Sequence, residues 1–421
     1  MEVVEGLDLG KFERQYRGRG TAAYYPAILL SLLVYGYATG VFSRCKNERA
    51  TNDSVAFRFI SAGQHPDHDT LASFRRRFLG ELKAVFVQVL QLAHEMKLLK
   101  LGTISLDGTK ILANASRHRA LSYYAHAEKI EAQLKGEVQE LLALAEQVDQ
   151  SAVPEGMDLP EELKRREERL AGIAQAKAKI EARAKARFEH EQAEYQTKCA
   201  QREAQQKASG KKPRGKPPKP PAAGPRPQDQ INLTDEDSRI MPVAGVGFEQ
   251  AYNPQAAVDA ATMLVVVSAL TQAPNDKEQV APTLGALQQL PPELGQAKQL
   301  LADTGYSSEH NLERCEAIGE EPFIAQGREA HHPGWRGRFE EPEPLPAAAT
   351  ARQRAAYRLK TKAGRAAYAL RKRTIEPVFG IIKSVMGFRQ FMLRGLDKVT
   401  GECRFVGLAW NLKRMAALRP T

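Results

Sequence analysis

The chain of 421 residues is long enough to bury a substantial core and to form two or three domains. Its 43% hydrophobic and 26% charged residues are an ordinary soluble composition, and its four cysteines are far apart and form no CxxC pair. This spacing argues against a zinc ribbon and a disulfide framework and fits a reducing cytosol. The net charge of +11 favours a polyanionic partner, nucleic acid before a membrane surface.

The uncharged stretch Thr21–Ser43 is long enough on paper to span a bilayer. It contains Pro26, Gly36, Gly40 and four tyrosines, so we interpret it as a packed helix that opens at Pro26 and runs through Gly36. The residues before it include acidic side chains and no apolar signal-peptide core. We therefore expect no membrane span and a cytoplasmic protein.

Residues 20–100 are predicted to be helical. A long amphipathic helix is expected to start at a cap formed by Asp69 or Thr70, because apolar residues recur after it at three- and four-residue spacing. Arg75, Arg76 and Arg77 are expected on its polar side, where arginines suit phosphate contacts. A solvated face is the alternative interpretation of the same three residues.

The next segments predict a strand followed by an insertion. Gly102–Leu106 reads as a strand that presents Asp107 at its C-terminal end. Residues 120–208 are rich in Ala, Glu, Lys, Gln and Arg and predict a helical hairpin or coiled coil. The basic, proline-rich stretch Ala208–Pro227 then predicts a linker without a packed core. We therefore interpret residues 120–230 as an insertion into the flanking domain.

Regular patterns return after the linker and predict a mixed α/β core. The expected elements are strands at Phe248–Asp259, Met263–Leu270, Lys298–Ala302 and Pro322–Ala325, and helices at Asp276–Leu290, 351–386 and 395–416. Residues 327–350, with His331 and His332, are expected to form a loop.

Three acidic residues are candidates for catalysis. Asp107 and Asp303 each follow a predicted strand, at the sheet edge where open α/β folds bind ligands, and Glu376 lies in a basic helical segment. Phosphodiester hydrolysis needs an activated water and a stabilised leaving oxygen, and two divalent ions held by carboxylates can serve both. Each acid also has a structural alternative: a turn at Asp107, a helix cap at Asp303, or an ion pair between Glu376 and Arg373.

Several motifs resemble the DDE-type transposases of bacterial insertion sequences. LADTGYSSEHN (Leu301–Asn311) is similar to the motif around their second Asp, SLDGTKILANAS to the first-Asp strand, AYNPQAAVD to the hairpin after it, and IEPVFGIIK to the region around the Glu. The family's Tyr–Arg–Glu–Lys signature maps onto Tyr368, Arg371, Glu376 and Lys383. The spacing from Arg371 to Glu376 is one residue longer than in the best-known version, so Arg373 is an alternative for that arginine.

The resemblance implies a fold and a domain layout. It predicts a helical N-terminal DNA-binding domain at 1–100, an InsH-like domain. An RNase H-like catalytic domain is expected at 101–119 and 231–421, interrupted by the helical insertion at 120–230. Asp107 would lie on the first strand, Asp303 after the fourth, and Glu376 on a late helix. Pro377 is expected to kink that helix or to place its start near Ile375.

The resemblance also implies DNA transposition with Asp107, Asp303 and Glu376 holding two Mg²⁺ ions, for which Mn²⁺ can substitute. The expected partners are double-stranded DNA of the terminal repeats and the target, bound by a homodimer, and no membrane. The residues expected to contact DNA are Tyr368, Arg371, Arg373, Lys383, Arg75, Arg76 and Arg77. The alternatives are a catalytically idle, transposase-derived DNA-binding protein and a structural coiled-coil protein.

Overall fold

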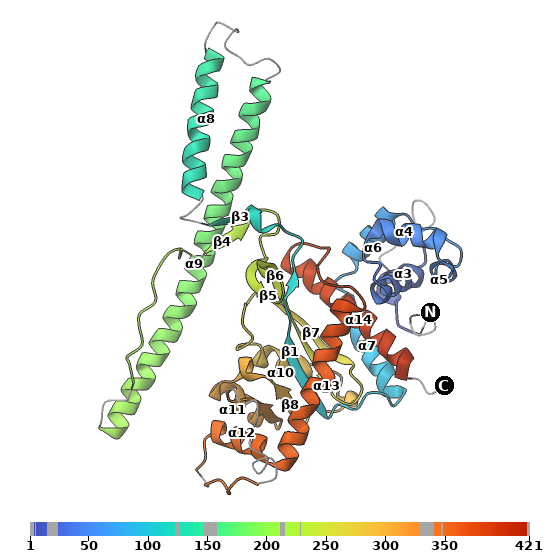
Figure 1. Cartoon of the computed structure of the whole chain (residues 1–421), viewed down its shortest axis with the longest axis vertical. Helices are drawn as coiled ribbons and strands as arrows, with labels where there is room; N and C mark the ends of the chain where they lie inside the picture. The colour runs from blue at the N-terminus through green and yellow to red at the C-terminus, as the bar shows by residue number, and fades with distance from the viewer. Residues whose placement is uncertain are drawn as a thin grey trace. The chain divides into compact units, whose positions relative to one another are not determined.

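The computed structural model describes residues 4, 6–14, 24–122, 127–146, 158–210, 215–227, 229–327, 341–346 and 348–418. The chain divides into two compact units (Figure 1). Unit 1 combines Met1–Asn114 with Asp237–Thr421, and unit 2 is Ala115–Glu236. His331 and His332 lie outside the described residues.

A mixed β-sheet in the order β7-β6-β1-β8-β9 forms the centre of unit 1. Its strands are β1 (Thr103–Gly108), β6 (Gly247–Asp259), β7 (Val265–Thr271), β8 (Gln299–Ala302) and β9 (Glu321–Ile324). β6 runs antiparallel to β1 and β7, whereas β1, β8 and β9 are parallel. This α/β sheet is consistent with the RNase H-like core expected from the sequence.

The strand positions follow from buried apolar runs. Leu300, Leu301 and Ala302 of β8 are fully buried, as a parallel strand covered on both faces requires. The N-terminal half of β6 extends beyond β1 and pairs instead with β2 (Ile111–Leu112) and β5 (Arg239–Val243). β2 and β5 were not expected from the sequence, because they are too short or too polar to give a clear alternating pattern.

Helices from the C-terminal part of the chain pack on this sheet. α14 (Leu396–Leu418) packs on β7 and on two N-terminal helices, α3 (Pro26–Thr39) and α7 (Leu82–Glu95). α13 (Lys362–Ser384) contacts β1, β6, β8 and β9. The side-chain amide of Asn411 on α14 pairs with both backbone groups of Val265, at 2.8 Å each. α10 (Val280–Gln288), α11 (Glu309–Ala317) and α12 (Ala351–Lys360) complete this part of unit 1. The single helix expected at 351–386 is therefore two helices, α12 and α13, divided at Thr361.

The N-terminal part of unit 1 is helical. Its helices are α2 (Gly10–Glu13), α3 (Pro26–Thr39), α4 (Arg44–Asp53), α5 (Val55–Ile60), α6 (His68–Arg77) and α7 (Leu82–Glu95). α3 begins at Pro26 as expected and continues to Gly40, whose φ of 84° ends it. No single helix in the described part of the chain is long and apolar enough to cross a membrane, although α3 and α4, bent by 98°, pass that test as a pair.

The long helix predicted after residue 69 is wrong in its start and its length. The cap is Asp67, whose carboxylate accepts a hydrogen bond from the Thr70 backbone N–H at 2.6 Å. The helix ends at Arg77, and α7 begins at Leu82 after a turn that contains Gly80. The apolar spacing continues across this turn, so periodicity alone could not reveal the break.

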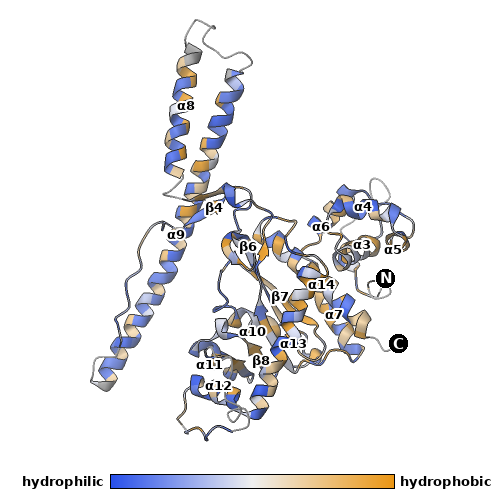
Figure 2. Cartoon of the chain, in the orientation of Figure 1, coloured by the Kyte–Doolittle hydropathy of each residue, from blue (hydrophilic) through white to orange (hydrophobic). Residues whose placement is uncertain are grey.

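Unit 2 contains α8 (Glu128–Glu146), α9 (Leu159–Ser209) and a two-stranded sheet of β3 (Ala120–Ser122) and β4 (Gln230–Asn232). Buried residues from these elements form one apolar cluster, which includes Leu134, Ile173, Ile180 and Ile231. Figure 2 shows that the C-terminal half of α9, which ends at Ser209, is mostly hydrophilic. Part of the proline-rich segment lies along this half, where Arg226 pairs with Glu191 at 2.6 Å.

Candidate active site

Asp107 lies within β1, where it pairs with Ala256 of β6, rather than just beyond the strand as predicted. Its Oδ1 atom accepts the backbone N–H of Gly108 at 2.8 Å, and its side chain is 17% exposed. Burial raises the pKa of Asp107 to about 6, although the Arg371 charge opposes this shift. The first acid is thus held in a fixed and largely desolvated position.

Asp303 immediately follows β8. Because β1 and β8 are parallel neighbours, Asp107 and Asp303 emerge at the same edge of the sheet. Oδ1 of Asp303 caps the short turn Thr304–Tyr306 by accepting the Gly305 N–H at 2.8 Å. The cap considered from the sequence therefore exists, and it leaves Oδ2 to face the site.

Glu376 lies on α13, which runs without interruption from Lys362 to Ser384 and includes Pro377. Of the two alternatives predicted for Pro377, a helix start near Ile375 is therefore wrong, and a kink at this position stays a prediction. A proline has no N–H, so Pro377 leaves the carbonyl of Arg373 without its helical hydrogen bond. α13 packs on β1 and β8, and Glu376 lies with both aspartates around one arginine.

Arg371 brings the three carboxylates together. Its Nη2 atom lies 2.8 Å from Asp107 Oδ2 and 3.7 Å from Asp303 Oδ2, and its Nη1 atom lies 3.0 Å from Glu376 Oε1. Its side chain is 11% exposed. Arg373, the alternative weighed from the sequence, is exposed on α13. Arg371 is therefore the arginine that faces the acidic residues.

A polar network that the sequence interpretation missed borders the site. Asp276, from the loop before α10, accepts hydrogen bonds from Asn253 and Gln255 of β6, at 2.6 Å each. Gln255 in turn accepts the hydroxyl of Tyr306 at 2.5 Å. A detectable signal was present in the sequence: Asn253 and Gln255 interrupt the otherwise apolar run Ala251–Val258, and buried polar side chains require partners. Residues 276–279 were instead expected to be helical, whereas α10 begins at Val280.

Two lysines flank the carboxylates. Lys110 lies 3.6 Å from Asp276, and Lys383 on α13 donates a hydrogen bond to the Thr109 hydroxyl. Burial lowers the pKa of both lysines, and their mutual repulsion contributes to the lowering at Lys383. The site thus combines acidic groups with cations that suit a phosphate.

The other residues predicted to contact DNA have different surroundings. Tyr368 is partly buried and packs against an apolar cluster around Leu301. Arg76 and Arg77 are exposed on α6. The expected polar-side position is wrong for Arg75, which is 9% exposed and donates to the Tyr37 hydroxyl at 3.0 Å.

The burial of Arg75 has a clear cause. Tyr37 donates to the carboxylate of Glu402 at 2.7 Å, and that carboxylate also accepts the backbone N–H groups of Met392 and Leu393. Arg75 supplies the positive charge for this buried acid. It therefore joins the N-terminal helices to α14.

The carboxylates suit a hard divalent cation in ligand type, because all their donor atoms are oxygens. No group of three or more His, Cys, Asp or Glu side chains in the described residues is arranged to hold a metal ion as it stands. The three acids converge instead on the guanidinium of Arg371. The donor set fits a metal, whereas the observed arrangement satisfies the acids through an arginine.

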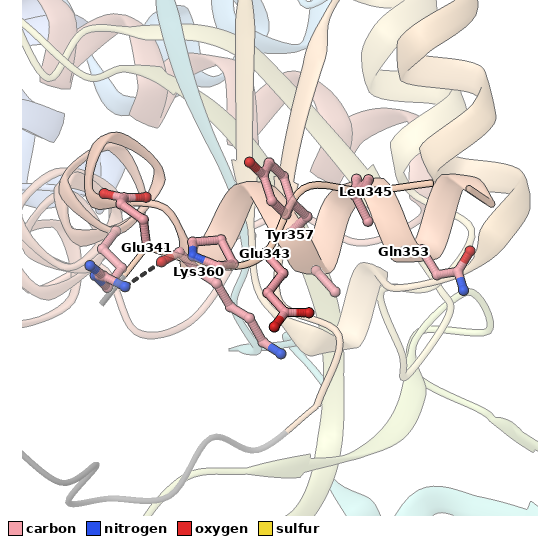
Figure 3. A pocket seen from close by; sticks show the side chains of 9 residues that line it. Glu341, Glu343, Leu345, Gln353, Tyr357 and Lys360 are labelled. Atoms are coloured by element: carbon pink, nitrogen blue, oxygen red, sulfur yellow. Dashed lines mark hydrogen bonds between the residues drawn. The ribbon is translucent and has the colours of Figure 1, made fainter. Parts of the chain in front are cut away.

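A surface depression of about 640 Å³ lies beside α12 (Figure 3). It is lined by residues of the segment before α12 and of α12 itself, among them Glu341, Glu343, Tyr357 and Lys360. None of the three candidate acids lines it, so we assign it no part in the site.

Comparison with known families gave two matches. Residues 343–416 match a family model described as a transposase DDE domain, and residues 2–77 match one described as a transposase domain of the DUF772 type. Glu376 and Arg371 fall within the first match, whereas Asp107 and Asp303 fall outside both. No curated protein and no solved structure gave a significant match.

Proposed function

We propose that this chain, a DDE-type transposase of the insertion-sequence kind, cleaves DNA at the ends of its element and joins those ends to target DNA. Asp107, Asp303 and Glu376 are the proposed acidic residues of the reaction. The observation that carries the proposal is the convergence of these three acids, from two strands and a distant helix, on one cationic group. An unrelated set of surface carboxylates has no reason to converge in this way.

DDE transposases generally use divalent metal ions, and we propose Mg²⁺, with Mn²⁺ as a substitute, held by the three carboxylates. When bound, two such ions would activate the attacking group and stabilise the leaving oxygen. Asp107 fits this role because β1 and β6 fix its side chain in a largely desolvated position. Glu376, at 48% exposure, has the most open position of the three.

The proposed reaction has two steps at the same site. Water first attacks a phosphodiester at the element end and releases a 3′-hydroxyl. That hydroxyl then attacks a phosphodiester of the target in line and displaces the target strand's own 3′-oxygen. Arg371 contacts the acids, and Lys383 donates to Thr109, two residues after Asp107; both would contact the phosphate in the two steps.

DNA contacts outside the site would come from exposed basic side chains. Arg76 and Arg77 on α6 and Arg373 on α13 meet this condition, whereas the buried Arg75 does not. We propose that the protein acts on double-stranded DNA as a homodimer, since two element ends must be held for joining. Arg373 is then a contact for flanking phosphates rather than a residue of the acidic centre.

An assay on the DNA that flanks the protein's own gene tests this function. Wild-type protein is expected to cut and join that DNA with Mg²⁺ and to do neither with a chelator. Asp303→Asn is expected to abolish both steps while leaving binding to end DNA unchanged. Glu313→Gln, which alters an exposed acid on the neighbouring α11, is the matched control and should behave like wild type.

Two outcomes would contradict the proposal. Cleavage that survives Asp303→Asn would show that the acidic centre is assigned wrongly. End binding by the wild-type protein without cleavage in either Mg²⁺ or Mn²⁺ would favour a catalytically idle DNA-binding protein.

A further inference from the structure

We propose that Lys110 contacts the DNA phosphate at the cut and that Asp276 is the positioning residue that holds Lys110 there. This inference rests on the proposed function. It adds Lys110 as a residue that contacts DNA and Asp276 as a carboxylate that positions Lys110. Neither residue is one of the three acids or part of the Tyr–Arg–Glu–Lys signature on α13.

Asp276 is anchored more firmly than a loop carboxylate usually is. Its Oδ1 atom accepts the Nδ2 group of Asn253 and the Nε2 group of Gln255, at 2.6 Å each. Asn253 also donates to the Ala273 carbonyl at 3.1 Å, which ties the loop to β6 on both sides of its turn. The carboxylate therefore has a fixed position and a fixed orientation.

The network is built against the backbone beside Asp107. A methyl group at Gly108 would lie 2.2 Å from Gln255 Nε2 and 2.7 Å from Asp276 Oδ1. A residue with a side chain at 108 would thus displace the network, so the glycine that follows Asp107 is required by close packing. Gln255 and Asp276 therefore pack closely against the backbone position that follows the first acid.

The same network reaches the second acid. Tyr306, three residues after Asp303, donates its hydroxyl to Gln255. Asn253 and Gln255 are 0% and 2% exposed, and a buried amide is costly unless its hydrogen bonds are made. Two such amides directed at one carboxylate show that the fold is arranged to keep Asp276 in place.

Lys110 is the group that Asp276 holds. It lies three residues after Asp107, its side chain is 15% exposed, and its Nζ atom is 3.6 Å from Asp276 Oδ1. The charges of Asp107 and Asp303 also act on it, and that of Lys383 repels it. An ammonium group has three donors, and Asp276 is its ion-pair partner among the described residues. Donors therefore remain for a phosphate between Lys110 and Lys383.

A direct metal-binding role for Asp276 is less compatible with this geometry. Its Oδ1 atom already receives two short amide hydrogen bonds and faces the Lys110 ammonium. A cation would have to share that oxygen with an existing positive charge. The positioning role uses the contacts as they stand.

The test compares variants of Lys110 and Asp276 and a control variant by cleavage, by DNA binding across salt concentrations and by Mn²⁺ binding. Lys110→Ala should lower cleavage by about tenfold to a hundredfold, as loss of a positioned phosphate contact does. It should also reduce the slope of log affinity against log salt by about 0.9, the value for one phosphate contact. Lys110→Arg should restore that slope, and Lys298→Ala, at the opposite end of β8, is the control expected to change nothing.

Asp276→Asn should reproduce both defects although Lys110 is still present, and it should leave Mn²⁺ binding unchanged. The double variant Lys110→Ala with Asp276→Asn should be no worse than Lys110→Ala alone, because both changes remove the same contact. Circular dichroism and a melting curve check that each variant is folded. If Asp276→Asn does not fold, the Lys110→Ala and Lys110→Arg pair decides the DNA contact.

An unchanged salt slope in Lys110→Ala would overturn the inference. Loss of Mn²⁺ binding in folded Asp276→Asn would also overturn it, since Asp276 would then be a metal ligand. The variant Asp107→Asn, measured in the same assay, distinguishes failure of this inference from failure of the proposed function. If Asp107→Asn retains cleavage, the proposed function is rejected. If Asp107→Asn loses cleavage but Lys110→Ala retains it, only the inference is rejected.

Discussion

Arg371 illustrates what decides a residue's role at this site. The sequence spacing allowed either Arg371 or Arg373 to accompany Glu376, because both precede it within a turn or so of helix. Only the packing of α13 on the sheet determines which of the two faces Asp107, and it is Arg371. Helical periodicity gives the angle of a residue around the helix axis. It does not say on which side of the helix the sheet lies.

Replacing Arg371 with Ala should destabilise the metal-free protein by about 2–3 kcal/mol, because the largely buried Asp107 would lose its cationic partner. Arg373→Ala, on the exposed face of the same helix, should change the free energy of unfolding by less than about 0.5 kcal/mol. Urea unfolding measures both. Equal effects of the two changes would contradict the assignment of Arg371.

A second prediction at this scale concerns Glu320, an acid outside the candidate site that is 6% exposed. Its Oε2 atom has no hydrogen-bond partner within the described residues, and burial raises the pKa of Glu320 to about 7. The folded protein therefore holds this proton more tightly than the unfolded chain does. Stability is fully present below the ordinary glutamate pKa and falls as the pH rises toward 7.

Glu320→Gln should remove that pH dependence. At pH 8 its free energy of unfolding should exceed that of the wild type by about 1–3 kcal/mol, and near pH 4 the two should agree. Unfolding in urea at both pH values is the measurement, with the exposed Glu313→Gln as control. A difference that does not depend on pH would contradict the burial argument.

The acids were accessible from sequence, whereas the residues that support them were not. Asp107 lies near the end of β1 and Asp303 directly follows β8, two strands that apolar runs predict well. Asp276 was overlooked because its partners, Asn253 and Gln255, are contributed by a strand more than twenty residues away. Arg75 was placed on a polar face because its buried partner, Glu402, lies near the other end of the chain. Such pairings depend on tertiary structure.

At the scale of elements, the junction of α12 and α13 decides where Arg371 and Glu376 lie. Thr361 ends α12 and caps α13 by accepting the Gly364 N–H at 3.0 Å. The two helices approach so closely here that a methyl group at Gly364 would lie 1.7 Å from the Arg358 carbonyl oxygen. The expected single helix over 351–386 gave no reason for this glycine, and the observed junction does.

Gly364→Ala should therefore lower the free energy of unfolding by about 2 kcal/mol or more and reduce cleavage, because α13 must shift to admit the methyl group. Gly380→Ala in the same helix is the matched control, since a methyl group there meets nothing within 4 Å. That change should stabilise the protein by about 0.5–1 kcal/mol through helix propensity. Opposite signs in the two melting curves are the expected result, and a shared sign would contradict the steric argument.

At the scale of the whole molecule, the chain forms two units and passes between them at two points, after Asn114 and after Glu236. The sequence predicted an insertion at 120–230 from its change in composition, and the second compact unit spans Ala115–Glu236. What the composition did not predict is the pairing of β3 with β4, which brings the two ends of the insertion together. Three-residue strands carry too little pattern to be read from a single sequence.

This pairing leads to a prediction about folding. Unit 2 has its own buried cluster, in which α8 and α9 cover Leu134, Ile173 and Ile180. Unit 1 has its own sheet, with both Asp107 and Asp303 on it. A unit that buries its own apolar surface does not depend on its neighbour for stability. Removal of the helical hairpin should therefore leave unit 1 folded.

Deleting residues 125–225, which keeps β3 and β4, should lower the helix signal in circular dichroism while the cooperative melting of unit 1 persists within a few degrees. The measurement is calorimetry of the full-length and shortened proteins, with solution mass recorded for both. A shortened protein that melts without cooperativity would contradict the independence of unit 1. If melting is retained but the solution mass falls from dimer to monomer, the insertion mediates self-association, and the antiparallel helices of unit 2 are then its contact surface.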